Sequence, residues 1–511
     1  MDLTKLLELQ NGSDIRGIAT EGISGEMINI NPLITKRIAQ AYVIWLSKKT
    51  GKPVDKLSVS VGRDSRISGP ALMESFIQGV IEIGASAIDC NIASTPAMYM
   101  STVFESTCFD GAVMLTASHL PYNRNGIKFF TSEGGLNKPD ITEILIIAST
   151  LKIVNSGQGT ISVFDLIDLY SDFLVNKIKS EVNHPQNFDK PLSEFHIVVD
   201  AGNGSGGFYA NKVLKKLGAN IQGSQFLDPD GMFPNHVPNP EDTVAMRFIQ
   251  NAVLKNSADL GIIFDTDVDR VAAVDHNGKS INRNNLIALI SAIVLEEHPG
   301  TTIVTDSITS DGLNYFIEKK LGGYHHRFKR GYKNVINESI RLNNEGKPSW
   351  LAIETSGHAA LKENFFLDDG AYLITKILIK AAQLKLEGKT NILDLITNLQ
   401  EPLESEEFRC KIKVAEFQDF GNKLISDIKE HVSEIEGWQL VANNYEGVRV
   451  ACNEFNGNGW FLIRLSLHDP IIPTNIESDS TGGVKIIAEK IYAFLKQYPL
   501  LDCSGLEKFL K

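Results

Sequence analysis

The chain has 511 residues, of which 43% are hydrophobic and 22% charged. Such proportions exclude a mostly disordered, collagen-like or coiled-coil chain, and the length predicts about three or four domains. Fifty Lys and Arg against 62 Asp and Glu give a formal net charge of −12. An acidic chain is a poor general binder of nucleic acid or anionic membrane surfaces, so an anionic ligand needs a local group of cationic side chains.

The cysteines and the apolar runs indicate in which compartment of the cell we expect the protein. The cysteines are widely separated and include no C-x-x-C pair, so neither a disulfide framework nor a zinc site is predicted. The N-terminus lacks the pattern of a signal or transit peptide. The longest apolar run, Leu286–Leu295, is far shorter than the roughly 20 residues that cross a bilayer. We expect a soluble cytoplasmic protein with no nucleic-acid or membrane partner.

Three stretches of the chain share one pattern, in which a short apolar strand is followed by a polar turn, a helix and a glycine. Their strands are residues 58–61, 196–199 and 302–305. Glycine suits the left-handed residue that ends many helices. Strands that alternate with helices predict α/β units with a largely parallel sheet.

Each of these units has a second half, in which an apolar strand leads into a polar loop. The loops are residues 116–119, 265–270 and 354–358. In open α/β sheets, ligands bind beyond the carboxyl ends of the strands. Three similar units therefore present three polar loops at equivalent places.

The last hundred or so residues depart from this pattern. A helical stretch at 417–432 precedes alternating, strand-like segments near 448–452 and 460–466, which predicts a smaller α+β domain. Polar or proline-containing stretches suggest the domain bounds, which we place at 1–160, 161–284, 285–402 and 403–511.

The second polar loop carries Asp265, Asp267 and Asp269. On an extended segment these side chains share one face at steps of roughly 6.5–7 Å, and a slightly wrapped loop brings three carboxylates onto one Mg²⁺. The alternative is a solvated acidic turn. An EF-hand is excluded because Arg270 stands at the sixth position and His276 at the twelfth.

The first polar loop offers a hydroxyl, an imidazole and two cations within a dozen residues: Ser118, His119, Arg124 and Lys128. A serine beside a metal-binding acidic loop can carry a phosphoryl group, because a divalent ion can bridge a phosphate oxygen. The alternative is an ordinary polar loop with a surface histidine.

The sequences T-A-S-H, D-x-D-x-D-R and E-x-S-G-H occur at these three loops, in this order. Together they resemble the α-D-phosphohexomutase superfamily, which includes phosphoglucomutases, phosphomannomutases and phosphoglucosamine mutases. The resemblance covers essentially the whole chain. It implies an α/β fold class, with three related mixed α/β/α domains plus a C-terminal α+β domain like the TATA-binding protein, around a central cleft.

The resemblance also implies roles for single residues. Ser118 is implied to be a phosphoserine that, with Asp265, Asp267 and Asp269, holds Mg²⁺. Arg16 is implied to face the transferred group, with His119 and Lys128 assisting proton transfer. Arg63 and Arg66 we interpret as solvated residues at a helix start. The implied substrate-binding residues are Arg270, Lys333, Glu354, Ser356, His358, Arg464, Ser466 and His468.

Two departures from the family pattern concern substrate binding. In the distal phosphate loop, Leu467 replaces a small residue and His468 stands where a threonine is usual. In the sugar loop, Ile353 replaces the glycine that usually precedes the glutamate. These changes leave catalysis plausible and put the identity of the substrate in question.

The predicted function is a monomeric or dimeric hexose-phosphate mutase that interconverts hexose 1-phosphate and 6-phosphate, with glucose or mannose as the sugar. A hexose 1,6-bisphosphate would be the intermediate and activator. Alternatives are a phosphoglucosamine mutase and a sugar-phosphate-binding paralogue without turnover. A haloacid-dehalogenase-type phosphatase is a further rival, because Asp265 to Val268 fit its motif, although Asp269 does not fit the fifth position.

Overall fold

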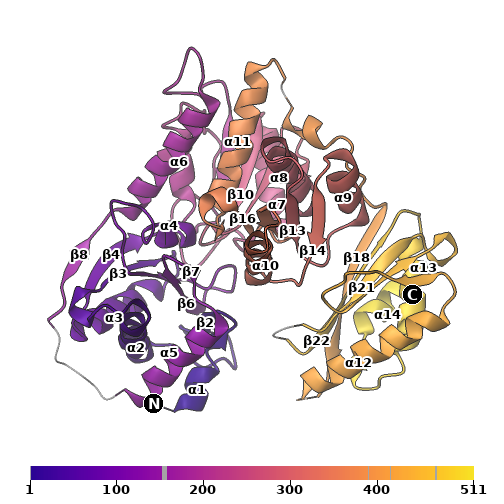
Figure 1. Cartoon of the computed structure of the whole chain (residues 1–511), viewed down its shortest axis with the longest axis horizontal. Helices are drawn as coiled ribbons and strands as arrows, with labels where there is room; N and C mark the ends of the chain where they lie inside the picture. Colours follow the sequence, from indigo (N-terminus) through magenta and orange to yellow (C-terminus); the bar gives the residue numbers. More distant parts are fainter. Residues whose placement is uncertain (1, 152–157, 390, 415, 467–468) are drawn as a thin grey trace. The chain divides into compact units, whose positions relative to one another are not determined.

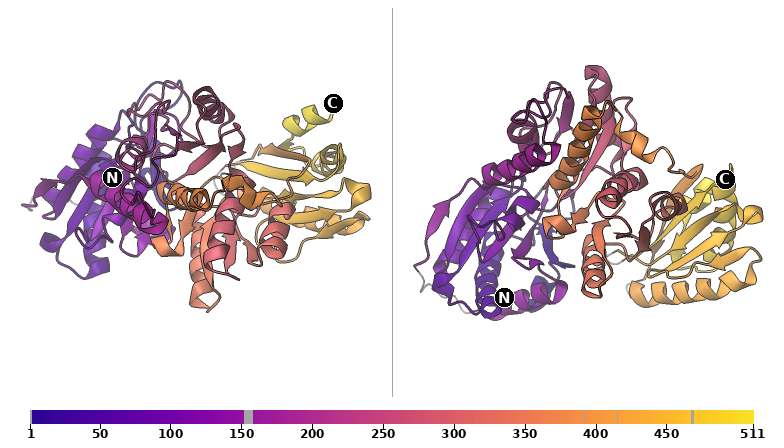
Figure 2. Two further views of the ribbon diagram at one scale, coloured as in Figure 1. Left: turned by 90° about the horizontal axis from the view of Figure 1, so that it is seen from above. Right: turned by 45° about the horizontal axis from the view of Figure 1, so that its top comes forward.

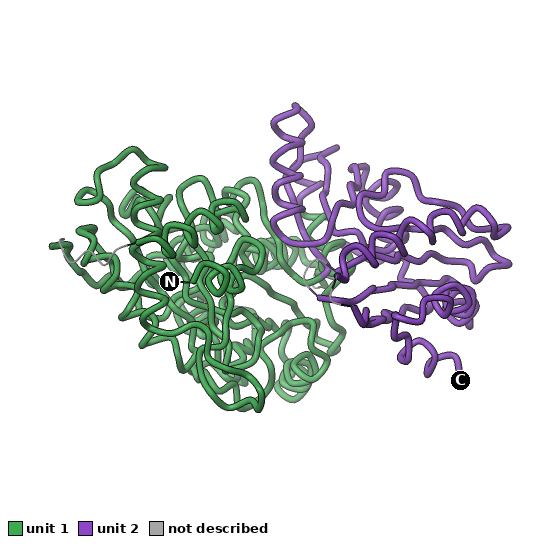
Figure 3. Tube along the Cα trace, turned by 90° about the horizontal axis from the view of Figure 1, so that it is seen from below, with its two compact units in different colours: residues 1–293, 356–394 green, residues 294–355, 395–511 purple. Residues whose placement is uncertain are grey.

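The structure, a computed structural model, describes residues 2–151, 158–389, 391–414, 416–466 and 469–511. It divides into two compact units, shown in Figure 3. Unit 1 comprises residues 1–293 and 356–394, and unit 2 comprises residues 294–355 and 395–511. Within the described residues no helix is long and apolar enough to cross a membrane.

The first sheet of unit 1 is mixed, and its main strands lie in the order β1-β2-β6-β5-β3-β4-β8 (Figure 1). Strands β5, β3, β4 and β8 pair in parallel, and β2, β6 and β5 pair antiparallel. The strands are β1 (Gln10–Asn11), β2 (Asp14–Ile18), β3 (Ser58–Arg63), β4 (Ser86–Ile92), β5 (Gly111–Leu115), β6 (Arg124–Thr131), β7 (Gly134–Gly135) and β8 (Ile161–Val163).

Helices cover this sheet because alternate strand residues are apolar. Val59 and Val61 of β3 and Val113 of β5 join one buried cluster with α2 (Pro32–Thr50), α3 (Gly69–Glu82) and α5 (Lys138–Thr150). Short helices α1 (Leu3–Leu7) and α4 (Thr95–Met100) complete this part of the unit. The polar residues after β3 and β5 are thereby left at the carboxyl ends of the strands.

The second sheet of unit 1 has the order β12-β11-β10-β9. Strands β9 and β10 are parallel, and β11 returns antiparallel to β10. The strands of this sheet are β9 (Ile197–Asp200), β10 (Leu260–Phe264), β11 (Val271–Asp275) and β12 (Ser280–Ile281). Unit 1 also contains α6 (Leu166–Val182), α7 (Thr243–Asn256), α11 (Gly370–Leu386) and the hairpin β16 (Ala359–Leu361) and β17 (Leu367–Asp368), which is not part of this sheet. Helix α8 (Arg283–Glu297) runs across the limit between the units at residue 293.

Unit 2 begins with three parallel strands in the order β14-β13-β15. These are β13 (Thr302–Thr305), β14 (Tyr324–Arg327) and β15 (Ser349–Ile353), with helices α9 (Asp311–Tyr315) and α10 (Tyr332–Asn344). The helices predicted after β9 and β13 are present, but Tyr209–Leu214 and Phe316–Lys320 within them are π-helical.

The C-terminal part of unit 2 is an antiparallel sheet with the order β19-β20-β21-β22-β18-β23. Helices α12, α13 and α14 share one apolar cluster with the inward residues of its strands, so they cover one face of the sheet (Figure 2). The elements are β18 (Glu404–Ile412), β19 (Trp438–Leu440), β20 (Val448–Cys452), β21 (Gly459–Ile463), β22 (Ile471–Ser478), β23 (Leu501–Asp502), α12 (Phe417–His431), α13 (Gly483–Leu495) and α14 (Ser504–Leu510).

The predicted fold class is confirmed. In each of the three α/β segments a parallel pair joins the two predicted strands: β3 with β5, β9 with β10, and β13 with β15. The smaller α+β domain follows them. The four domain bounds stay a prediction.

Candidate active site

Ser118 lies three residues after the last residue of the buried strand β5. Its Oγ is 3.0 Å from Asp265 Oδ2, 3.1 Å from a terminal nitrogen of Arg270 and 3.4 Å from His119 Nδ1. The Ser118 backbone is left-handed, with φ 49°, which is uncommon for a residue other than glycine. The hydroxyl therefore contacts both a carboxylate and a guanidinium. The guanidinium is the partner that a negatively charged group on this oxygen would need.

Arg66 holds the backbone of the serine loop. The interpretation of this residue as solvated is wrong, since its side chain is fully buried and paired with Asp64 at 3.1 Å. Sequence reasoning missed it because a guanidinium at a helix start is usually hydrated. Arg63, by contrast, is partly exposed. The guanidinium of Arg66 donates to four backbone carbonyls, those of Ser118, Leu120, Pro121 and Arg124.

We expect Arg66→Met to lower the free energy of unfolding by about 3–5 kcal/mol, because it leaves the Asp64 carboxylate buried without its counter-charge. It should also loosen the serine loop, which loses four donors. Chemical denaturation followed by circular dichroism measures the first effect. The double variant Asp64→Asn/Arg66→Met is the control, and it should be less destabilised than Arg66→Met alone. Equal stability of Arg66→Met and the native chain would contradict this role.

The acidic loop follows β10 and is wrapped rather than extended. Val268 is fully buried and adopts a φ of 70°, a region in which a β-branched residue is strained. This turn brings oxygens of Asp265, Asp267 and Asp269 within 4.8 Å of one another, and all three residues are buried. The prediction of a solvated acidic turn, which was the alternative, is therefore wrong.

The donor set of this loop fits a divalent cation. Asp267 Oδ1 and Asp269 Oδ1 are buried and have no hydrogen-bond partner among the described residues. Lys128 Nζ, on β6, lies 2.5 Å from Asp269 Oδ2 and 3.2 Å from Asp267 Oδ2. Three buried carboxylates, two of which have an unpartnered oxygen, are ligands that Mg²⁺ prefers.

The charges in the loop shift the ionisation of its carboxyl groups in opposite directions. Burial, followed by repulsion from Asp269 and Asp267, raises the pKa of Asp265 well above its usual value. Burial also opposes ionisation of Asp269, but Lys128, His358 and Arg270 outweigh it and lower the pKa of that carboxyl. Such divergence is expected where like charges crowd together, and a cation bound there would lower the raised pKa of Asp265.

Arg270 and His119 lie on either side of the serine hydroxyl. Arg270 is buried, donates to His119 Nδ1 at 2.8 Å and pairs with Asp265 at 3.2 Å. Desolvation of the ring, and then the charge of Arg270, lower the pKa of His119 far below its usual value. Because the guanidinium of Arg270 can only donate, His119 Nδ1 accepts this hydrogen bond and the proton of the ring lies on Nε2.

Arg16 also lies beside the serine loop. It sits on β2, donates to the backbone carbonyl of Thr116 and pairs with Asp14 at 2.8 Å. Gly126 on β6 permits this approach, because a Cβ there would lie 2.1 Å from the Ile15 carbonyl and 2.9 Å from that of Thr116. The structure therefore places Arg270 against Ser118 itself, Arg16 against the start of the serine loop and Lys128 against the acidic loop.

The third polar loop crosses the limit between the units after Thr355. In unit 2, Glu354 is buried and its Oε1 accepts a hydrogen bond from the backbone of Gly331 at 2.6 Å. That bond fixes the turn before Lys333, the second residue of α10. In unit 1, Ser356 Oγ lies 2.8 Å from His358 Nδ1.

Unit 2 also gathers two guanidinium groups that are far apart in the sequence. Arg464 is buried, and its Nε has no hydrogen-bond partner among the described residues. Desolvation lowers the pKa of Arg464. It outweighs the negative charges of Glu446 and other acids, which raise this pKa, and the positive charge of Arg330 lowers it further. Arg330 lies 3.8 Å from the buried Asp306. Sequence reasoning missed Arg330, whose position depends on the tertiary structure.

The distal loop is described only in part. Ser466 donates its backbone N–H to Ile471 at 3.1 Å, and its Oγ accepts from the backbone of Asp469. His468, the predicted substitute for the usual threonine, and Leu467 lie outside the described residues. The roles of all these side chains stay predictions.

Comparison with known families gives three consecutive matches. Residues 9–153, 168–278 and 282–399 match domains I, II and III of the phosphoglucomutase/phosphomannomutase alpha/beta/alpha models. A phosphoglucomutase of Neisseria gonorrhoeae is 29% identical over 445 residues, covering 87% of this chain and 89% of the relative. A phosphomannomutase/phosphoglucomutase of Pseudomonas putida is 27% identical and covers 90% and 93%.

Solved structures agree on the fold. A phosphoglucomutase/phosphomannomutase family protein of Burkholderia thailandensis superposes with a TM-score of 0.77 at 24% identity, covering 97% of this chain and 98% of the other. Parafusin, a phosphoglucomutase of Paramecium, gives 0.72 at 18% identity, covering 98% and 95%. The three domain matches decide against the dehalogenase-type phosphatase. The chain belongs to the phosphoglucomutase/phosphomannomutase family of the α-D-phosphohexomutase superfamily, and it is an enzyme of the mutase type that the sequence predicts.

Proposed function

We propose that this enzyme interconverts hexose 1-phosphate and hexose 6-phosphate through a phosphoryl group carried on Ser118. The observation that carries the proposal is the position of the Ser118 hydroxyl. It lies 3.0 Å from Asp265 in a buried acidic loop and 3.1 Å from the guanidinium of Arg270. Names of the relatives support the same reaction, since they are phosphoglucomutases and phosphomannomutase/phosphoglucomutases.

In phosphoryl transfer the enzyme mainly aligns the reacting groups and neutralises negative charge, because the reaction needs little covalent chemistry from the protein. Asp265, Asp267 and Asp269 would hold Mg²⁺, which when bound offsets negative charge on the phosphoryl group. Arg270, from the acidic loop, and Arg16, from β2, contact the serine loop and add positive charge. His119 accepts from Arg270 through Nδ1, so the ring carries its proton on Nε2 and would donate it to an oxygen of the substrate.

The two guanidinium groups of unit 2 would bind the phosphate that stays on the sugar. Arg464 supports this role because its buried Nε is unpartnered in the described structure. Charge-assisted, bidentate contacts are what guanidinium groups offer to phosphate. Glu354, Ser356 and His358 are proposed to contact the sugar hydroxyls, with Lys333 near the phosphate. A hexose 1,6-bisphosphate is the proposed intermediate and activator.

The test is an assay of each sugar phosphate together with an intact-mass measurement. Glucose 1-phosphate and mannose 1-phosphate are each converted to the 6-phosphate and measured by coupled oxidation, with glucosamine 1-phosphate as the third arm. We expect turnover of glucose or mannose phosphate and a mass increase of one phosphoryl group on the purified protein. Tight binding of these compounds without turnover or adduct would instead favour the binding-protein alternative.

Arg464→Ala should lower kcat/KM by about 10- to 150-fold for the 1-phosphate and the 6-phosphate alike, because it removes a charge-assisted contact of roughly 1.5–3 kcal/mol. Steady-state kinetics in both directions measure the effect. Arg409→Ala is the matched control, because Arg409 is an exposed arginine of the same sheet and should leave kcat/KM unchanged. Unchanged kcat/KM in folded Arg464→Ala would contradict its role as a clamp for the phosphate.

A further inference from the structure

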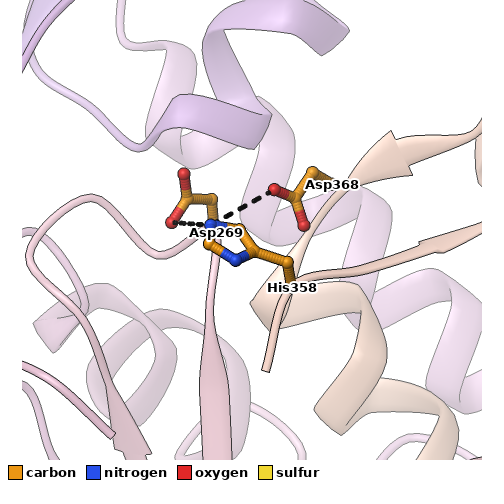
Figure 4. Close-up of side chains that lie close together, drawn as sticks. All are labelled: Asp269, His358 and Asp368. Carbon is orange, nitrogen blue, oxygen red and sulfur yellow. Dashed lines mark ion pairs between the residues drawn. The ribbon is translucent and has the colours of Figure 1, made fainter. Parts of the chain in front are cut away.

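A second group of metal-binding side chains lies next to the acidic loop, within unit 1. His358 Nε2 is 3.8 Å from Asp269 Oδ1 and 3.7 Å from Asp368 Oδ2. Figure 4 shows the imidazole between the two carboxylates. One ligand atom from each of the three side chains lies within 4.8 Å of the other two. Neither the predicted Mg²⁺ set nor the proposed reaction includes Asp368.

The backbone fixes this approach. Arg270 and His358 form an isolated antiparallel bridge, which ties the acidic loop to the segment before β16. Gly357 has a φ of 93°, and a Cβ there would lie 2.7 Å from the Val271 carbonyl oxygen. Gly370 is equally close, with a Cβ position 2.7 Å from the carbonyl carbon of Arg270. Because these two glycines have no Cβ, His358, just before β16, and Asp368, on β17, can lie close to the acidic loop.

The separations between these atoms suit two ligands of one ion. At 3.7 and 3.8 Å they exceed the length of a hydrogen bond. With metal–ligand bonds of roughly 2.0–2.2 Å, two ligands of the same ion lie up to about 4.2 Å apart. Asp269 Oδ1 is buried and accepts no hydrogen bond in the described structure, and the nitrogen of Arg270 that faces it lies 3.9 Å away, beyond hydrogen-bond length.

The surroundings of these side chains hold the ligand atoms in place. Asp368 Oδ1 accepts from the backbone N–H of Ala359 at 3.0 Å, which orients the carboxylate. His358 Nδ1 lies 2.8 Å from Ser356 Oγ. When the imidazole donates that Nδ1–H to the serine hydroxyl, the lone pair of Nε2 faces both carboxylates. A hydrogen bond of this kind usually fixes a metal-bound histidine.

We propose that Asp269, His358 and Asp368 form a second divalent-cation site, selective for transition metals such as Zn²⁺ and Co²⁺. One imidazole and two carboxylates are a mixed nitrogen and oxygen set, which borderline metals favour, whereas Mg²⁺ prefers oxygen alone. The two sites share Asp269, whose Oδ2 faces Lys128 and whose Oδ1 faces His358. An ion here occupies His358 Nε2, so it inhibits the mutase; this effect, unlike the binding, rests on the proposed function.

The experiment titrates Co²⁺ into the full-length protein in saturating Mg²⁺ and follows the visible absorption of the bound ion. We expect one equivalent of Co²⁺ to bind in the native chain. His358→Gln and Asp368→Asn should each weaken this binding at least about 10- to 100-fold. Asp267→Asn is the matched control: it damages the Mg²⁺ set alone and should keep the Co²⁺ spectrum.

Circular dichroism separates loss of the site from loss of the fold, and His358→Gln, which adds no charge, serves if Asp368→Asn unfolds. Unchanged Co²⁺ binding in a folded His358→Gln protein overturns the proposal, as does a native chain that binds no Co²⁺. The mutase assay is run separately, on protein free of Co²⁺ and in Mg²⁺. Activity in that assay without Co²⁺ binding in the titration leaves the proposed function intact, and Co²⁺ binding without activity in the Co²⁺-free assay refutes that function alone.

Discussion

Ser118→Ala should fold as the native chain does and lose at least about 10³-fold in kcat, which corresponds to roughly 4 kcal/mol of barrier. The substitution removes the Oγ that contacts Asp265 and Arg270 and that carries the phosphoryl group in the proposed reaction. Stopped assays of both sugar phosphates measure kcat. The phosphoryl adduct in the intact mass should disappear with the activity.

Ser132→Ala is the matched control for this variant. Ser132 is an exposed serine that follows β6 in the same part of unit 1, and its removal should leave both kcat and the adduct unchanged. If Ser118→Ala retains more than about a tenth of the native kcat, a barrier change of only about 1.4 kcal/mol, then Ser118 does not carry the phosphoryl group.

Removal of divalent metal should abolish activity, and Asp267→Asn should raise the Mg²⁺ concentration needed for half-maximal activity by at least about 10- to 100-fold. The reason is that Asp267 supplies a buried oxygen with no partner in the described structure, between two other carboxylates. EDTA treatment followed by a Mg²⁺ titration of the mutase assay measures both effects.

Asp228→Asn serves as the control for the metal experiment. Asp228 is an exposed aspartate of unit 1, so its loss changes the net charge by the same amount and should leave the Mg²⁺ dependence as it is in the native chain. Full activity of protein freed of metal would reject the assignment of Asp265, Asp267 and Asp269 as a magnesium set.

The sequence predicted the three polar loops well because local hydrophobicity marks the strands that precede them. Apolar runs at 111–115, 260–264 and 350–353 correspond to β5, β10 and β15, and Ser118, Asp265 and Glu354 follow these strands. The carboxyl ends of parallel strands lie at the same edge of the sheet. An apolar run followed by a polar loop in the sequence is therefore enough to predict where functional side chains gather.

The conformation of the acidic loop was predicted only in outline. The spacing of Asp265, Asp267 and Asp269 suggested a shared face, but convergence of the three carboxylates requires the left-handed backbone of Val268. No propensity favours a buried valine in that region. The strain is tolerated because the flanking strands β10 and β11 pair over their whole lengths and hold the loop between them.

What the sequence by itself determined is the fold class and the chemical type of each polar loop, because both depend on residues that are near neighbours in the chain. What only the tertiary structure decided is which distant side chains complete those loops. Arg66 is buried because it donates to backbone carbonyls of residues 118–124. Arg330 lies near Arg464 in space, although more than a hundred residues separate the two in the sequence. Whether an arginine is solvated or buried depends on partners that folding supplies, and those contacts leave no trace in local periodicity.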